Sequence, residues 1–175
     1  MKKIRPLLAA ILLVMIAIPV SVYSKTDVCW IYYDSNDEIV DCTVNLNENH
    51  IVQEKFLSRN GSINKIEIRA ITWNNTYPED ASLSISIVDG NEMLSNKFVN
   101  LNQFPDNQFY AIPIDPVRVS ESMNLSIRLE YVGSTVPNGN FAIAITHEGK
   151  ISSDSAALVD NNIQDFHLCL KVWGE

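Results

Sequence analysis

Apolar and polar residues alternate with a period of two through most of this chain, and that period restricts it to β-strands. The clearest example is the stretch 82–87, in which leucine and isoleucine alternate with three serines. Side chains point alternately to the two faces of a sheet, so a half-buried strand gives this pattern. The stretches 125–131 and 166–172 repeat it. Each of the three is expected to have one face toward solvent.

Five further stretches bring the number of expected strands to eight. Four are 51–57, 63–72, 93–101 and 108–114; the fifth, 141–145, is apolar on both faces and is expected to be a covered central strand. Turns rich in Gly, Asn, Asp and Pro separate them, and no helical stripe follows residue 25. The sequence therefore predicts an all-β chain with a single β-sandwich, the eight-stranded jelly roll being the leading architecture. The expected core includes Ile66, Ile68, Leu83, Ile85, Leu125, Ile127, Phe141, Ile143, Leu168 and Leu170.

The N-terminus has the composition of an export signal. Lys2, Lys3 and Arg5 precede an uncharged apolar run over 7–23. Such a run is typical of a signal peptide, and at this length an uncleaved N-terminal membrane anchor is the alternative. Residues 1–24 are therefore expected to direct the rest of the chain out of the cytoplasm. Contact with a membrane is expected only through an uncleaved 7–23 segment.

The charge of the chain argues against nucleic-acid binding. The formal net charge is −8, and residues 1–24 contain three basic residues and no acidic one. Removing them leaves a net charge near −11, without a basic stripe to contact phosphates. The remaining length suits one domain. We assign the sandwich to residues 46–175 and a hairpin or stalk to 25–45.

The cysteines suggest one disulfide. If Ser35 and Asn36 form a two-residue hairpin loop, Cys29 and Cys42 lie opposite each other and a Cys29–Cys42 bridge is possible. Cys169 is then a small buried apolar residue. Pairing of Cys169 with either of the others remains open, because connectivity does not follow from sequence.

No catalytic motif is found, so the chain is not expected to be an enzyme. The three histidines lack the spacing of a metal site, and no nucleophile elbow or phosphate-binding glycine loop is present. No metal or cofactor is expected, although Asp89, Asn91 and Glu92 in one turn and residues 160–162 in another offer oxygen ligands for a structural calcium ion. Ordinary turn chemistry explains both clusters equally well.

One loop has the composition of a sugar-binding site, which needs an exposed aromatic ring and nearby polar side chains. The candidate residues are Trp73, Asn74, Asn75, Tyr77, Glu79 and Asp80. A tryptophan at a strand end can also close the core of a sandwich, so exposure of Trp73 separates the two interpretations. Trp30 and Trp173 are further aromatic candidates, and Trp173 is expected to cap the core.

Several segments between residues 51 and 145 carry a family resemblance. They are Val52-Gln53-Glu54-Lys55-Phe56, the strand 63–73, the strand 83–89 and the later pieces Asp106-Asn107-Gln108-Phe109-Tyr110, Ile114-Asp115-Pro116-Val117 and 125–129. This stretch resembles the carbohydrate-binding-module-like, galactose-binding-type jelly roll of bacterial extracytoplasmic and membrane proteins linked to surface polysaccharide synthesis. The resemblance implies an exported, non-catalytic module that recognises cell-surface or extracellular glycan and is accessory to polysaccharide assembly. The alternative is a structural or protein-interaction sandwich that docks an envelope protein and binds no sugar.

Overall fold

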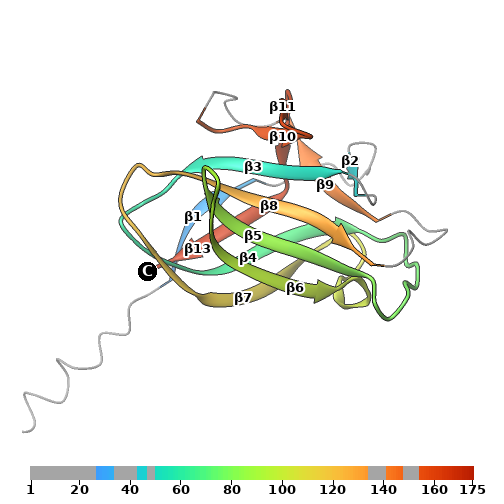
Figure 1. Cartoon of the computed structure of the whole chain (residues 1–175). Helices are drawn as coiled ribbons and strands as arrows, with labels where there is room; N and C mark the ends of the chain where they lie inside the picture. Colours follow the sequence, from blue (N-terminus) through green and yellow to red (C-terminus); the bar gives the residue numbers. More distant parts are fainter. Residues whose placement is uncertain (1–26, 34–42, 47–49, 134–140, 148–153) are drawn as a thin grey trace, which may run out of the picture.

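The period-two segments form two antiparallel sheets that pack face to face (Figure 1). The structure is a computed structural model, and it describes residues 27–33, 43–46, 50–133, 141–147 and 154–175. These residues form a β-sandwich, as the sequence predicted. None of their helices is long and apolar enough to cross a membrane. The proposed export segment 1–24 lies outside the described residues.

The first sheet has six strands. Their order is β11 (Asn162–Ile163), β10 (Ala157–Val159), β3 (Ile51–Leu57), β8 (Asn124–Val132), β5 (Ser82–Asp89) and β6 (Glu92–Asn100). The central pair is fixed by a continuous ladder in which Gln53 of β3 lies opposite Arg128 of β8. In Figure 1 this sheet lies in front of the strands β1, β13 and β4.

The second sheet has seven strands. Its main order is β1 (Val28–Tyr32), β13 (Leu170–Gly174), β4 (Gly61–Ile71), β9 (Ala142–Thr146) and β12 (His167–Leu168), while β2 (Thr43–Asn45) pairs with β9 and β7 (Gln108–Val119) pairs with β4. A short 3-10 helix, η1 (Leu101–Gln103), connects β6 to β7. Consecutive strands often change sheet, so the chain crosses the sandwich repeatedly.

The structure contains more strands than the eight expected, for local reasons. The segment expected at 166–172 divides into β12 and β13 at Cys169, whose N–H donates to Ala144 O on β9 and whose carbonyl accepts from Arg69 N on β4. The hairpin of β10 and β11 was not predicted. Its strands of three and two residues are too short to show a period.

The predicted core is confirmed. Each of its ten residues is at most 3% exposed. The interpretation of 141–145 as covered on both faces is confirmed as well, because all five residues of β9 are buried.

The serine-rich strands β5 and β8 have an outer face, on which the side chains of Arg128 and Glu130 are 38% and 34% exposed, but the serines on it are not exposed as expected. Ser84, Ser86 and Ser126 are only 7%, 4% and 8% exposed. Their cross-strand neighbours have longer side chains; Arg128 lies opposite Ser86, and Asn96 flanks it on β6. Short hydroxyl side chains are thus shielded by taller neighbours and form the floor of the outer face of the six-stranded sheet.

The two described ends of the segment 25–45 pair with the sandwich. Val28 of β1 lies opposite Gly174 of β13, and Thr43 of β2 lies opposite Ala144 of β9. Neither described strand pairs with the other, so the hairpin register expected for this segment is absent from the part of the chain described here. The segment extends the seven-stranded sheet on two of its strands.

Cys42 lies outside the described residues, so the Cys29–Cys42 disulfide stays a prediction, which non-reducing peptide mapping tests. Sγ of Cys29 lies 2.9 Å from Ile31 O, and burial, the largest effect, raises the pKa of this thiol. A Cys42–Cys169 bridge also stays a prediction, whereas the alternative Cys29–Cys169 bridge is wrong for this structure. Cys29 lies opposite Trp173, four residues from Cys169, which corresponds to roughly 13 Å along a strand and is too far for a disulfide.

Candidate functional site

The predicted sugar-binding tryptophan lies at the tip of a tight turn after β4. Asn75 N donates to Thr72 O over 2.9 Å, and the two central residues, Trp73 and Asn74, have φ values of 49° and 56°. Two consecutive positive φ values are characteristic of a type I′ turn. This conformation suits asparagine, but for a bulky residue such as tryptophan it is an outlier. The side chain of Trp73 is 45% exposed.

One carboxylate holds this turn in place. Oδ1 of Asp106 accepts hydrogen bonds from Thr72 N and Trp73 N, both over 2.8 Å, and from Thr72 Oγ1 over 3.2 Å. Its second oxygen, Oδ2, accepts from Asn74 Nδ2 over 3.3 Å. Asp106 lies in the loop before β7, so the turn is fixed by a segment more than thirty residues away. The aromatic ring is therefore presented on a rigid turn.

Tyr77 is buried between the loop and the core, so the prediction that it is a second sugar-stacking ring is wrong. It is 4% exposed, and its hydroxyl donates to Thr72 O over 3.1 Å. Burial is the main cause of its raised pKa. Its ring meets Phe141 edge to face, with centroids 5.8 Å apart, and Asn102 brackets its backbone by accepting from Tyr77 N and donating to Tyr77 O.

The other predicted loop residues are exposed. Asn74 and Asn75 share the turn of Trp73, and Glu79 and Asp80 follow before β5. The amide of Asn74 is engaged by Asp106, whereas Glu79 is held through its backbone, whose carbonyl accepts from Asn100 Nδ2 over 2.7 Å. The structure therefore brings the exposed ring of Trp73 together with two exposed asparagines, while Glu79 and Asp80 lie further along the loop.

The remaining tryptophans are not exposed rings. Trp30 is 9% exposed and belongs to the core. Trp173 is half-buried, and the ammonium of Lys65 lies 4.1 Å from its ring centroid. Trp73 is thus the tryptophan that the described part of the chain presents to solvent.

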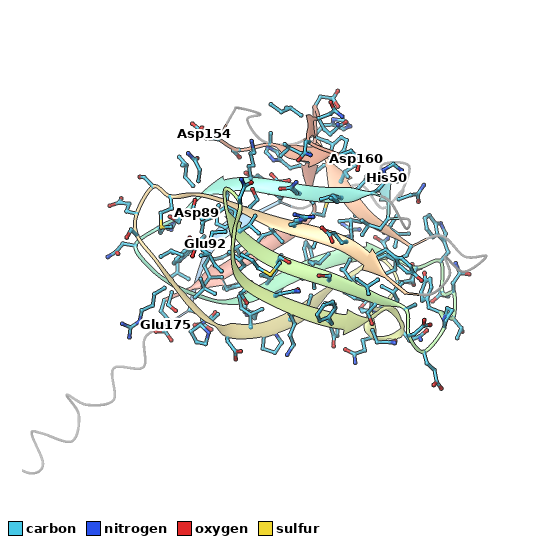
Figure 2. All side chains as sticks on the ribbon, in the orientation of Figure 1. His50, Asp89, Glu92, Asp154, Asp160 and Glu175 are labelled. Atoms are coloured by element: carbon cyan, nitrogen blue, oxygen red, sulfur yellow. The ribbon has the colours of Figure 1, made fainter. Side chains whose placement is uncertain are left out.

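The two acidic clusters considered for calcium are turns. Asp160 and Asn161 have φ values of 49° and 65° and connect β10 to β11. Asp160 accepts from Ile51 N over 3.0 Å through Oδ1, and its Oδ2 lies 2.6 Å from His50 Nδ1 (Figure 2). The backbone hydrogen bond, followed by the one from His50, lowers the pKa of Asp160. Among the described residues, no three His, Cys, Asp or Glu side chains are grouped to hold a metal ion.

A buried carboxylate and imidazole form the most unusual polar pair of the molecule. Glu54 on β3 and His167 on β12 are both 0% exposed, and Oε1 of the acid lies 2.6 Å from Nδ1. Oε2 accepts from Leu168 N over 2.8 Å. The ring of Tyr33 stacks on the imidazole with centroids 4.0 Å apart and planes 6° from parallel. Because a substrate cannot reach either group in this structure, we interpret the pair as a structural link between the two sheets.

Sequence reasoning missed the supports of the candidate site. Asp106 was noted only within a segment that carries the family resemblance, and Asn102 was not singled out. Both act across the fold, between the loop after β4 and the segment joining β6 to β7, so no local sequence signal connects them to Trp73.

No protein-family model and no curated protein matches this sequence. The resemblance to the galactose-binding-type jelly rolls therefore stays a prediction, and the function has to be argued from the geometry of the site.

Proposed function

We propose that this protein is an exported, non-catalytic binding module that recognises a cell-surface or extracellular glycan through Trp73. The observation that carries the proposal is the exposed indole, 45% accessible, on a turn pinned by Asp106. An aromatic ring fixed in solvent can stack on the apolar face of a sugar without first paying for its own ordering. Strained backbone at an exposed residue is a reason to suspect a binding role.

Two further parts of the proposal concern export and the fold family. Export rests on the basic and apolar residues at the N-terminus. A jelly roll of the galactose-binding type is supported by the frequent change of sheet between consecutive strands, such as β3 to β4 and β7 to β8. N-terminal sequencing of the secreted protein tests the export part.

The test of the glycan proposal uses Trp73→Gly. Glycine accepts positive φ values without strain, so this variant removes the ring while keeping the turn. The free energy of unfolding should change by no more than about 1 kcal/mol. A glycan identified on an array should bind the wild type in calorimetry, and the part of this binding that depends on Trp73 should be lost in the variant. Phe98→Ala is the control, since Phe98 on β6 is 58% exposed and should not affect binding.

Two results would overturn the proposal. The first is a wild type that binds nothing on the array, and the second is unchanged glycan affinity in Trp73→Gly. A loss of several kcal/mol of stability in that variant would instead assign Trp73 to the structure of the loop.

The alternative function is protein interaction through strand β6. This strand is the last in the six-stranded sheet, and its residues Met93 and Phe98 are 57% and 58% exposed. Exposed apolar residues on an edge strand suit the addition of a partner strand. In that case Phe98→Ala should lose a partner protein while Trp73→Gly keeps it.

A further inference from the structure

A second polar site lies on the outer face of the six-stranded sheet. It is an open trough of about 610 Å³ that crosses β10, β3 and β8 and reaches the turn between β5 and β6. Its polar lining includes Lys55, Asp89, Asn91, Asn124 and Ser126. In Figure 2, Asp89 lies with Asp154 toward one end of this sheet. A volume of this size falls within the range of ligand-binding sites.

The hydrogen-bonding groups of the trough are largely unused. Within the described residues, the side chains of Lys55, Asp89, Asn124 and Ser126 have no hydrogen bond or ion pair. Gln53 and Asn161 are exceptions, since Gln53 Nε2 donates to Asn161 Oδ1 over 3.3 Å. Ser126 is 8% exposed and lines the trough. Polar groups that no protein group engages are available to a ligand that displaces water from them.

We propose that this trough binds an uncharged polyhydroxylated chain, that is, a neutral glycan. Carboxylate and serine oxygens accept hydrogen bonds from sugar hydroxyls, and the Lys55 ammonium and the asparagine amides donate to them. The mixture of donors and acceptors suits hydroxyl groups, each of which does both. Trp73 plays no part in this site. It lies in the loop before β5, whereas Asp89 ends that strand, so the two sites are separated by the length of β5, roughly 25 Å.

Other ligand classes fit the trough less well. A divalent cation would be repelled by the ammonium of Lys55. A polyanion would meet Asp89 and Asp154 on a chain whose net charge is −8. A protein partner generally needs an apolar centre to its interface, and this lining is mainly polar.

The inference shares its ligand class with the proposed function and rests on it to that extent. Nuclear magnetic resonance of the isotope-labelled protein separates the two sites. The probes are cellohexaose, mannohexaose and the N-acetylglucosamine hexamer, with hexagalacturonate as the anionic comparison. At least one neutral probe should shift the amide signals of residues 89–91 and 124–126, and hexagalacturonate should not.

Lys55→Ala should weaken this binding by about tenfold or more. Lys97→Ala, which removes an exposed lysine on β6 outside the trough, should leave it unchanged. Shifts around Trp73 without shifts in the trough would overturn this inference and leave the proposed function standing. Shifts in the trough that persist in Trp73→Gly, with no shift at residue 73 in the wild type, would overturn the proposed function and leave this inference standing. No shift with any probe would overturn both, and equal binding of hexagalacturonate would overturn the ligand class.

Discussion

Replacing Glu54 tests whether the buried acid and imidazole link the two sheets. In Glu54→Ala, the N–H of Leu168 and Nδ1 of His167 both lose their partner. Each unpaired buried group costs about 1–3 kcal/mol. With the cavity left by the side chain, we expect a loss of about 3–5 kcal/mol in the free energy of unfolding. That is a large part of the stability of a domain.

Glu54→Gln is the matched comparison. The amide oxygen can accept from Leu168 N, and the amide nitrogen can donate to Nδ1 of His167, so both hydrogen bonds are retained. We expect a change within about 1 kcal/mol, because both hydrogen bonds made by Glu54 are retained. Glu67→Ala is the control for loss of a carboxylate. Glu67 is on the other sheet, lies 3.2 Å from Lys65 and 3.7 Å from Lys171, and has a side chain that is 15% exposed. Because solvent still reaches these groups, its loss should cost less than that of the wholly buried Glu54.

The pH dependence of stability provides a second readout. Desolvation raises the pKa of Glu54 above its ordinary 4.5, and the hydrogen bonds from His167 and Leu168 offset this only in part. The folded state then holds the proton more tightly than the unfolded state. The stability that this provides is fully present below pH 4.5 and is lost as the pH rises through the raised folded-state pKa. Glu54→Gln should lose this component.

Urea denaturation followed by intrinsic fluorescence, repeated between pH 4 and 8, measures all of these quantities. Glu54→Ala within about 1 kcal/mol of the wild type would refute the reasoning. So would a Gln variant as unstable as the Ala variant, or one with an unchanged pH slope. If the Ala variant does not fold, the pH profile of the Gln variant alone decides.

Three further predictions concern the turn, the N-terminal strand and the core. Asp106→Ala removes the acceptor of four hydrogen bonds from the turn. It should weaken glycan binding in calorimetry although Trp73 remains, and undiminished binding would contradict the argument that Asp106 fixes the turn. Gly174→Ala would place a methyl carbon 2.5 Å from the indole of Trp30 on β1. We therefore expect the free energy of unfolding, measured by urea denaturation, to fall by about 1–3 kcal/mol. A neutral result would mean that β1 does not pack on β13 as described. Ile127→Ala, at a wholly buried position, should cost about 2–5 kcal/mol in the same assay, and a neutral effect would reverse the assigned faces of β8.

The strands and core could be predicted because their signal is local. The stretch 51–57 was predicted with the bounds that β3 has, and its inward residues follow directly from the period. Burial of the serines on β5 could not be predicted in the same way. It depends on the height of the side chains on neighbouring strands, such as Arg128 on β8, and the order of the strands is not encoded in any one of them.

The candidate site was predictable only in part, for the same reason. Composition directed attention to Trp73, and the sequence left its exposure open. The exposure is decided by Asp106 and by Tyr77, which fills the space below the turn. Two aromatic residues four positions apart thus have opposite environments. Neither spacing nor composition distinguishes an aromatic ring that supports a loop from one that the loop presents.

Glu54 is a charged residue on the apolar face of β3, and this exception to the pattern carries information. Val52, Glu54 and Phe56 share the inward face of β3 and are 0%, 0% and 2% exposed. A carboxylate between two core residues is too costly unless it is neutral or has partners. The period alone therefore implies a partner for Glu54 from a distant strand, although it does not identify His167. A polar residue on an otherwise apolar strand face therefore indicates a specific polar contact with the opposite sheet.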